Sequence, residues 1–324
     1  MIDQMGSHRA SRWAVRRLAA LAVGLALGLA SAAQAAYQIT TLDYAGADSS
    51  QGWDINNNGV FVGTATFGAD VLGYLVSGGV STSVTGPAGS LGSSALGISD
   101  GGAVVGSFYS TRVNVVDPGP QTGYILDSGV YTTLSLPGSA ETYLRAISPG
   151  GRYVTGYAIT GAGQIQSFVY DRNNSTFTIL TTSNQLTIAQ GVTDAGVVVG
   201  NLRSGAQRDG FIYDAGVLSF SHQLGALDTD YRGINESGLI DGFYVDATGT
   251  THGLLGAPGS FVTFDVAGAA GTNLEGINNA GWLAGIYGDA NGVSHAFLAT
   301  PVPAPPVTAL LLLALPLLGA RRRH

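Results

Sequence analysis

Carboxylates are the side chains through which this chain could do chemistry, because a pair of them can hydrolyse a glycosidic bond. Glutamate is scarce, and between residues 37 and 300 only Glu141, Glu236 and Glu275 could join an aspartate in such a pair. Glu236 lies in a predicted turn, where solvation is the expected role. A glycan-active enzyme would therefore use Asp230 or Glu275, and this alternative depends on the elements that position them.

Other catalytic and cofactor signatures are missing from the sequence. It has no Gly-x-Ser-x-Gly nucleophile elbow and no phosphate-binding P-loop. Three histidines lie between residues 37 and 300, and two of them, His252 and His295, share one position of a repeat that is described below. Equivalent positions on neighbouring repeats do not converge easily on one metal ion. We therefore expect a packing or strand-start role for His252 and His295, no metal site, no cofactor and no enzymatic activity.

One segment resembles the start of a calcium-binding loop. In Asp54-Ile55-Asn56-Asn57-Asn58-Gly59, oxygen donors stand at alternate positions and glycine stands at the sixth. The twelfth position is Ala65, where an EF-hand has a bidentate glutamate. Weak calcium binding and a plain turn are the two interpretations, and the other copies of the repeat favour the turn.

The repeat consists of six copies, each centred on one aliphatic residue. These residues are Ile55, Ile98, Ile147, Val192, Ile234 and Ile277. The intervals between them are 43, 49, 45, 42 and 43 residues, a spacing typical of repeat architectures. One residue after each stands Asn, Ser or Thr, and four residues after each stands glycine. A short polar side chain that bonds its own turn, followed by a glycine that can take positive φ, predicts a hairpin tip.

Each copy also contains the apolar runs of a four-stranded unit. After each tip come aliphatic residues and a second glycine, as in Val104-Val105-Gly106, whereas the third copy has Thr155 at that position and Gly156 one later. A third run starts near an aromatic residue or Leu, and a fourth is clearest in residues 261–266. These runs are rich in β-branched and aromatic residues, which favours strands. Units of this size match the blade of a propeller.

The two ends of the array are complementary. The sixth copy stops near residues 298–300, after its third strand, and residues 37–47 line up with the fourth-strand segment 260–269. An N-terminal strand that completes the last blade closes the ring and removes exposed sheet edges. We therefore predict an all-β fold, a six-bladed β-propeller over residues 36–300, with an open β-solenoid as the alternative.

The candidate ligand site is the position two residues before each central aliphatic, because no backbone rule demands its mixture of side chains. The occupants in chain order are Trp53, Leu96, Arg145, Gln190, Arg232 and Glu275. The first strand of a propeller blade lines the central channel, so these groups are predicted to form a binding funnel, joined by Tyr143, Asp230 and Tyr231. The predicted ligand-binding residues are Trp53, Arg145, Gln190, Arg232 and Glu275. The alternative is a solvated channel mouth whose charges pair, such as Arg232 with Glu275.

One long connection is predicted to overhang this funnel. It joins the second and third strands of the second copy, at residues 110–122, and contains Asp117-Pro118-Gly119-Pro120. Because strand direction alternates within a blade, this connection emerges on the same face as the connections between blades.

Composition excludes several classes of function. All 14 basic residues are Arg, and residues 37–300 contain seven of them against 20 acidic residues, a net charge of −13. Such a surface repels phosphate backbones, so we expect no nucleic-acid partner. The chain has no cysteine, which excludes disulfides and thiolate metal sites.

Residues 1–35 predict a secretory signal peptide. Four arginines between residues 9 and 17 precede an apolar run near residues 18–30, and Ala33-Gln34-Ala35 supplies a small-x-small cleavage site. The pair Arg16-Arg17 lacks the flanking residues of a twin-arginine signal, so general secretion is favoured. A buried N-terminal helix is the alternative.

Residues 301–324 predict a sorting segment. Val302, Pro303 and Pro305 lie in a proline-rich stretch, an apolar run of 14 residues follows, and the chain closes with Arg321, Arg322 and Arg323 before a final His. Fourteen residues are fewer than the ~20 that span a bilayer as a transmembrane helix. The order of proline motif, apolar helix and Arg cluster resembles the PEP-CTERM sorting signal of exopolysaccharide-producing Gram-negative bacteria, in which Glu stands where this chain has Ala304.

This resemblance implies a route for the protein. It implies processing by an exosortase-type membrane protease, membrane contact through the C-terminal segment before processing, and passage through the periplasm to the cell surface or extracellular matrix, as in a biofilm. The alternative is a plain C-terminal tail anchor whose positive charges stay on the cytoplasmic side.

The repeat itself resembles the HAF repeat of bacterial extracellular proteins. Gly276-Ile277-Asn278-Asn279-Ala280-Gly281 and His295-Ala296-Phe297 match its motifs, and His252-Gly253-Leu254 is a degenerate copy. No enzymatic activity defines that family. We therefore expect an exported, surface-associated propeller that acts as a non-catalytic matrix or binding module for exopolysaccharide. A glycan-active enzyme and a protein-interaction scaffold are the alternatives.

Overall fold

The computed structural model describes residues 37–114, 118–180, 186–205 and 207–302. The chain divides into two units, residues 39–300 and the two ends, 1–38 with 301–324. The predicted signal peptide lies outside the described residues, as do Pro303, Pro305 and the Arg cluster of the predicted sorting segment. Within the described residues, no helix is long and apolar enough to cross a membrane.

The strands of the described residues form six antiparallel four-stranded sheets. Blade 1 contains β2 (Ser49–Ile55), β3 (Phe61–Phe67), β4 (Asp70–Ser77) and β5 (Val80–Val84). Blade 2 contains β6 (Gly92–Ile98), β7 (Val104–Tyr109), β8 (Thr122–Asp127) and β9 (Val130–Leu134). Blade 3 contains β10 (Ser139–Ile147), β11 (Tyr153–Thr160), β12 (Ile165–Asp171) and β13 (Thr176–Ile179).

The other three blades follow the same order. Blade 4 contains β14 (Leu186–Val192), β15 (Val198–Ser204), β16 (Gln207–Asp214) and β17 (Val217–Ser221). Blade 5 contains β18 (Asp228–Ile234), β19 (Ile240–Val245), β20 (Thr251–Gly256) and β21 (Val262–Phe264). Blade 6 contains β22 (Gly271–Ile277), β23 (Leu283–Gly288), β24 (Ser294–Pro301) and, from the start of the chain, β1 (Tyr37–Thr41).

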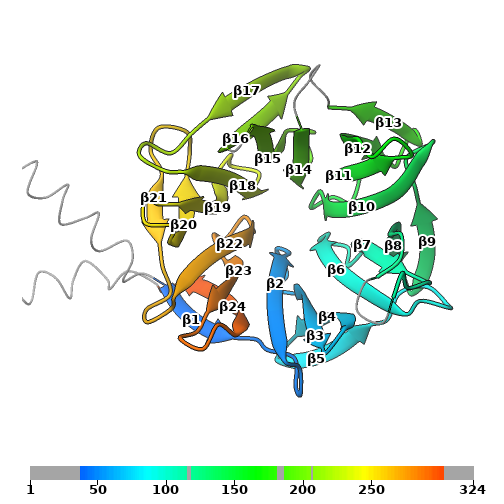
Figure 1. Cartoon of the computed structure of the whole chain (residues 1–324), viewed down its shortest axis with the longest axis horizontal. Helices are drawn as coiled ribbons and strands as arrows, with labels where there is room; N and C mark the ends of the chain where they lie inside the picture. The colour runs from blue at the N-terminus through cyan, green and yellow to red at the C-terminus, as the bar shows by residue number, and fades with distance from the viewer. Residues whose placement is uncertain (1–36, 115–117, 181–185, 206, 303–324) are drawn as a thin grey trace, which may run out of the picture. The chain divides into compact units, whose positions relative to one another are not determined.

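Figure 1 shows the six sheets arranged as blades around one axis, with the first strand of each copy innermost. The predicted six-bladed β-propeller is confirmed, and the open β-solenoid is wrong. Sheet order β1-β24-β23-β22 confirms that the N-terminal strand completes the last blade. Beyond the strand itself, Leu42 N donates to Ala296 O at 2.8 Å, and Asp43 Oδ1 accepts from Ala296 N at 2.9 Å.

The predicted hairpin tips are confirmed in all six copies. Each tip glycine has a φ between 75° and 85°, and its N–H donates to the carbonyl of the short polar residue. In blade 1, Asn56 Oδ1 accepts from the N–H groups of Asn58 and Val60 at 3.0 and 2.9 Å. In blade 3, Ser148 N donates one residue further along, to Tyr153 O at 2.8 Å. This longer tip explains why Gly156 comes one residue later than its equivalents.

A belt of hydrogen bonds joins the six tips. In five copies the second residue of the tip carries a side-chain oxygen, which accepts a backbone N–H from the previous blade. The pairs are Asn57 N to Asp100 Oδ1 (2.9 Å), Gly150 N to Asp194 Oδ1 (2.7 Å), Asp194 N to Glu236 Oε1 (2.8 Å), Glu236 N to Asn279 Oδ1 (2.9 Å) and Asn279 N to Asn57 Oδ1 (2.8 Å). Pro149 lacks such an oxygen, and Asp100 N donates to its carbonyl instead at 2.8 Å. The belt therefore closes across blades 6 and 1.

The second glycine of each copy lies against the inner strand of its own blade. A Cβ on Gly106 would lie 1.8 Å from the carbonyl oxygen of Ser94, which no side chain can tolerate. Equivalent distances at Gly63, Gly156, Gly200, Gly242 and Gly285 are 2.5, 2.0, 2.1, 2.0 and 2.4 Å. The short distance between the first and second strands therefore requires glycine at this position in every blade.

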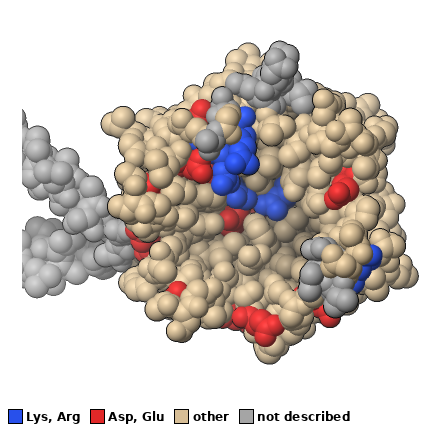
Figure 2. Space-filling model, viewed as in Figure 1, with Lys and Arg blue, Asp and Glu red and all other residues tan. Residues whose placement is uncertain are grey.

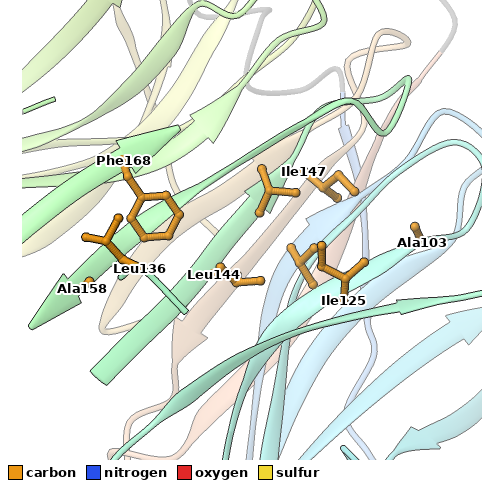
Figure 3. Packing of buried hydrophobic residues seen from close by; sticks show 9 residues of the cluster. Ala103, Ile125, Leu136, Leu144, Ile147, Ala158 and Phe168 are labelled. Carbon is orange, nitrogen blue, oxygen red and sulfur yellow. The ribbon is translucent and has the colours of Figure 1, made fainter. Parts of the chain in front are cut away.

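The hydrophobic core lies between neighbouring blades. Figure 3 shows one such cluster, in which Ala103 and Ile125 of blade 2 pack against Leu144, Ile147 and the other residues of blade 3. Similar clusters join other pairs of blades, so each blade buries its faces against two neighbours. Such packing needs a closed ring if no blade is to leave a face uncovered.

Deletion of residues 37–47 is expected to lower the thermal stability of the propeller and to promote its association. The deletion removes β1 and the residues Leu42 and Tyr44 that pack on the cluster between blades 6 and 1. It also exposes the edge of β24, and free edges pair with other chains. Thermal denaturation and size-exclusion chromatography check this, and a monomer of unchanged melting temperature would contradict the closure.

Two glycine substitutions form a matched pair. We expect Gly106→Ala to destabilise the fold by about 3 kcal/mol or more, because the new methyl group would overlap the carbonyl of Ser94. A Cβ on Gly161 would have no atom within 4 Å, and this residue has no positive φ, so Gly161→Ala should change stability by less than about 0.5 kcal/mol. Urea denaturation of both variants makes the comparison, and equal effects would argue against a steric cause.

Candidate functional site

Each inner strand carries a β-bulge at the position that varies between the copies. In blade 1, Gly52 pairs with Gly63 and Asp54 pairs with Val62, so Trp53 has no partner in the ladder. The same register shift leaves out one residue in every other blade: Leu96, Arg145, Gln190, Arg232 and Glu275. A bulge re-aims the side chain that it releases. The strand pairing therefore places no restriction on the side chain at this position, and its type can differ between the six blades.

All six bulge residues line one cavity on the axis of the propeller. The space that they border measures about 620 Å³ when the open solvent within it is included, and residues of the hairpin tips also line it. Figure 2 shows a hollow at the centre of the ring, with basic groups on its wall and an acidic group beside them. The predicted ligand-binding residues Trp53, Arg145, Gln190, Arg232 and Glu275 are thus brought together.

Arg145 reaches across the axis and holds groups from two other blades. Its Nε donates to Gln190 Oε1 of blade 4 at 2.7 Å. Its guanidinium lies 4.7 Å from the ring centroid of Trp53 of blade 1, a cation–π contact. Trp53 Nε1 in turn donates to Thr64 Oγ1 at 3.0 Å. These contacts fix the guanidinium without giving it a carboxylate partner.

Arg232 lies in an ionic cluster on the opposite side of the cavity. Its Nη1 is 3.3 Å from Glu275 Oε2, and its Nε is 3.2 Å from Asp230 Oδ1. Asp230 is fully buried and also accepts from Asn201 Nδ2 at 2.9 Å and from Arg208 Nη1 at 3.4 Å. The pairing of Arg232 with Glu275, the alternative to a ligand site, is present in the structure.

The buried charges of the cavity shift one another's pKa values. Burial raises the pKa of Glu275, although Arg232 and Arg145 favour its charged form. Burial and the nearby Arg232 lower the pKa of Arg145. Burial alone would lower the pKa of Arg232, but its carboxylate neighbours outweigh this effect and raise it. Within the described residues, Glu275 Oε2 and Arg232 Nε are buried without a hydrogen bond of good geometry.

The sequence interpretation missed the buried acid Asp241 and considered the part-buried Asp54 only as part of a calcium-like segment. Asp241 is fully buried and accepts from Gly233 N at 2.5 Å, and burial raises its pKa well above the usual range. Its position is aliphatic in four of the other copies and Thr in the fifth: Val62, Val105, Thr155, Val199 and Ala284. A charge at a position of this kind was the signal that could have found it. Asp54 likewise replaces the glycine or alanine of its equivalents.

None of the three residues that were predicted to join the funnel, Tyr143, Asp230 and Tyr231, lines the cavity. Tyr231 is fully buried inside its blade and packs on Phe261, at 5.3 Å between ring centroids, so it does not face the channel. Tyr143, one position from the blade core, stacks on Tyr157 at 4.6 Å and donates to Glu141 Oε2 at 2.6 Å. The two tyrosines occupy neighbouring positions of the repeat, because Tyr143 lies four residues before its central aliphatic residue and Tyr231 lies three before. Neighbouring side chains of a strand point to opposite faces, so the two rings have different surroundings.

The three glutamates have separate roles. Glu141 is bonded to Tyr143, Glu236 belongs to the tip belt, and Glu275 lines the cavity. The described part of the long connection is anchored on blade 1, where Arg112 pairs with Asp70. Asp117 lies outside the described residues.

The predicted packing role of the histidines is confirmed. His252 stacks on Tyr244 and His295 on Tyr287, with ring centroids 5.1 and 5.0 Å apart. Each also bonds an aspartate, as His295 Nδ1 does with Asp43 Oδ2 at 2.6 Å. No group of three or more His, Cys, Asp or Glu that could hold a metal ion occurs in the part of the chain that the structure describes.

The calcium-like segment of blade 1 is a turn. Asp54 Oδ1 accepts from Ile55 N at 2.8 Å, and Asp54 Oδ2 accepts from Ile98 N at 2.9 Å. Asn56 Oδ1 accepts two backbone N–H groups of its own tip. These oxygen atoms are directed at backbone donors, as the turn interpretation requires.

Comparison with known proteins bears on the fold. No protein-family model and no curated protein matches the chain. A gluconolactonase from Xanthomonas campestris is similar with a TM-score of 0.50 and 12% identity, over 82% of this chain and 90% of that one. A mutant of Aleuria aurantia lectin in complex with Fucα1-6GlcNAc has a TM-score of 0.48 and 8% identity, over 82% and 99%.

A prolyl endopeptidase is also similar, with a TM-score of 0.48 and 14% identity over 84% of this chain. The chain spans 43% of the length of that protein. The propeller neighbours thus include a lectin and enzymes at low identity, and at such identity the likeness shows the fold alone, because one fold hosts many functions.

Asp54 should make the stability of the propeller depend on pH. Burial raises its pKa from 3.8 to about 6, so the folded chain binds this proton more tightly than the unfolded chain. The stabilisation that this proton gives is complete below pH 3.8 and is lost as the pH rises through about 6. Such a shift corresponds to about 3 kcal/mol.

The measurement is urea denaturation of the wild type and Asp54→Ala between pH 4 and pH 7, Ala being the residue that blade 3 has at Ala146. We expect the free energy of unfolding of the wild type, relative to the variant, to fall as the pH rises. A difference that stays constant over this range would contradict the raised pKa.

Proposed function

We propose that this protein is an exported, surface-associated β-propeller that acts as a non-catalytic matrix or binding module, with its ligand site in the axial cavity. The observation that carries the proposal is the ring of bulges. Six bulges direct six side chains into one cavity, and their chemistry differs where the rest of the repeat is uniform. A cavity with an aromatic group and a few convergent polar groups is typical of a ligand site.

The two carboxylates considered for catalysis, Asp230 and Glu275, are poorly placed for it. Asp230 has no exposed surface and is bonded to Asn201 and Arg208. The Glu275 side chain is 2% exposed and lies beside Arg232. A general acid must come within hydrogen-bond distance of the bond that it protonates. A glycan-active enzyme that uses Asp230 or Glu275 is therefore the second candidate, and a binding module is the first.

The destination of the protein is part of the proposal. The order of signal peptide, propeller and sorting segment supports export, processing by an exosortase-type protease and display at the surface of a Gram-negative cell. An extracellular polysaccharide is the ligand that such a location makes available.

Glycan-array binding distinguishes the two candidate functions. We expect binding that falls at least tenfold in Arg145→Ala and Arg232→Ala, with no release of sugar by the wild type. Arg152→Ala is the matched control, because Arg152 pairs with Asp171 and does not line the cavity. Sugar release that is abolished by Glu275→Gln would establish the enzyme instead. Thermal denaturation accompanies each variant, because Arg232→Ala leaves buried carboxylates unpaired and should cost about 3 kcal/mol.

A further inference from the structure

The arginines of the propeller are unevenly distributed. Residues 37–300 contain seven of them. Three pair with surface aspartates of the turns and strand ends: Arg112 with Asp70, Arg152 with Asp171, and Arg172 with Asp127. The other four belong to blades 3, 4 and 5, and they are Arg145, Arg203, Arg208 and Arg232.

These four arginines form a continuous basic track. Arg203 and Arg208 face each other across β15 and β16, beside the connection between these strands. Asp230 contacts both Arg208 and Arg232, at 3.4 and 3.2 Å. Arg232 and Arg145 both line the axial cavity. Figure 2 shows a basic surface on the face of the ring beside the central hollow, and it continues into that hollow.

The track carries one positive charge more than its neighbours neutralise. The carboxylates within ion-pair distance of it are Asp228, Asp230 and Glu275, against four guanidinium groups. Among the described residues, no carboxylate lies within ion-pair distance of Arg145 or Arg203. These two arginines have no carboxylate partner although residues 37–300 contain 20 acidic residues and carry a net charge of −13. Arg203 is exposed to solvent, but Arg145 is part-buried, and a part-buried cation without a counter-ion costs free energy unless an anion joins it.

Arg145 is prepared to hold such an anion. Gln190 accepts the Nε proton, and the Trp53 ring supports one face of the guanidinium, so both Nη groups remain available. Two parallel N–H groups match the two oxygens of a carboxylate. Arg145 is the part-buried member of the four arginines that has no carboxylate within ion-pair distance, so one negative charge matches it and a monoanion fits better than a phosphate dianion. The Tyr143 and Tyr157 rings, stacked at 4.6 Å, lie close enough to the arginines for Arg145 to influence the pKa of Tyr157.

We propose that the central hollow binds a saccharide that carries a carboxylate, a uronic acid residue, with Arg145 as the anchor of the carboxylate. Arg203 and Arg208 extend the positive potential to the rim and guide the anion inward. Arg232 is held by Asp230 and Glu275 and positions the wall of the site. This inference rests on the proposed binding function and adds the charge of the ligand to it.

Calorimetric titration with glucuronate, glucose and acetate tests the inference, with the full propeller at low salt. We expect glucuronate to bind at least tenfold more tightly than either glucose or acetate, and its affinity to fall as sodium chloride is added. Arg145→Gln should reduce the affinity for glucuronate at least tenfold and remove its advantage over glucose. Arg203→Gln should reduce it less, and this exposed substitution does not put folding at risk. Arg152→Gln is the matched control and should change nothing.

Each other result has a distinct meaning. Equal binding of glucose and glucuronate would overturn the role of the carboxylate and leave the proposed binding function intact. Equal affinities for acetate and glucuronate would show that the site recognises only the carboxylate, and would overturn the proposal that the ligand is a saccharide. Binding of glucuronate that survives both Arg145→Gln and Arg203→Gln would place the site elsewhere. If no sugar binds, both this inference and a saccharide-binding function are wrong.

Discussion

The contact between the first two strands of each blade is the constraint on which the rest of the propeller depends. The second strand approaches the inner strand so closely that one of its residues has no room for a side chain, as Gly106 shows against the carbonyl of Ser94. Opposite this glycine the inner strand accommodates one extra residue as a bulge. The glycine and the bulge recur together in six blades, so the same backbone geometry that packs the blade also delivers one free side chain to the axis.

Ring closure rests on short-range chemistry at the hairpin tips. A backbone N–H of one tip donates to an oxygen of the next, and the belt continues from blade 6 to blade 1 through Asn279 and Asn57. At Pro149 a backbone carbonyl substitutes for the missing side chain. The tips are therefore uniform because they serve two neighbours at once, their own turn and the adjacent blade. Because the tip residues make both sets of hydrogen bonds, their side chains cannot change freely. The bulge residues have no such role, so their side chains can differ between blades.

The sequence predicted the positions of the repeat better than the contacts between its copies. The tips, the blade count and the completion of blade 6 by β1 follow from spacing and turn chemistry, and the structure confirms them. The role of Tyr231 was wrong because the face of an inner-strand residue depends on where the bulge falls. Sequence spacing alone also does not reveal that Arg145 reaches Trp53 two blades away, since this contact depends on the radius of the ring.

Blade 6 combines the first strand of the propeller, β1, with its last three strands, β22, β23 and β24. Strand β1 pairs only with β24, and Asp43 and Ala296, which hydrogen-bond there, are 253 residues apart in sequence. The strands of five blades are consecutive in the sequence, whereas the strands of blade 6 come from both ends of the propeller. Strand β1 is synthesised first and its partner β24 last. Closing so long a loop is slow compared with forming a hairpin. The contact that closes the ring therefore forms only after the last strand has been synthesised, between segments that lie 253 residues apart in the sequence.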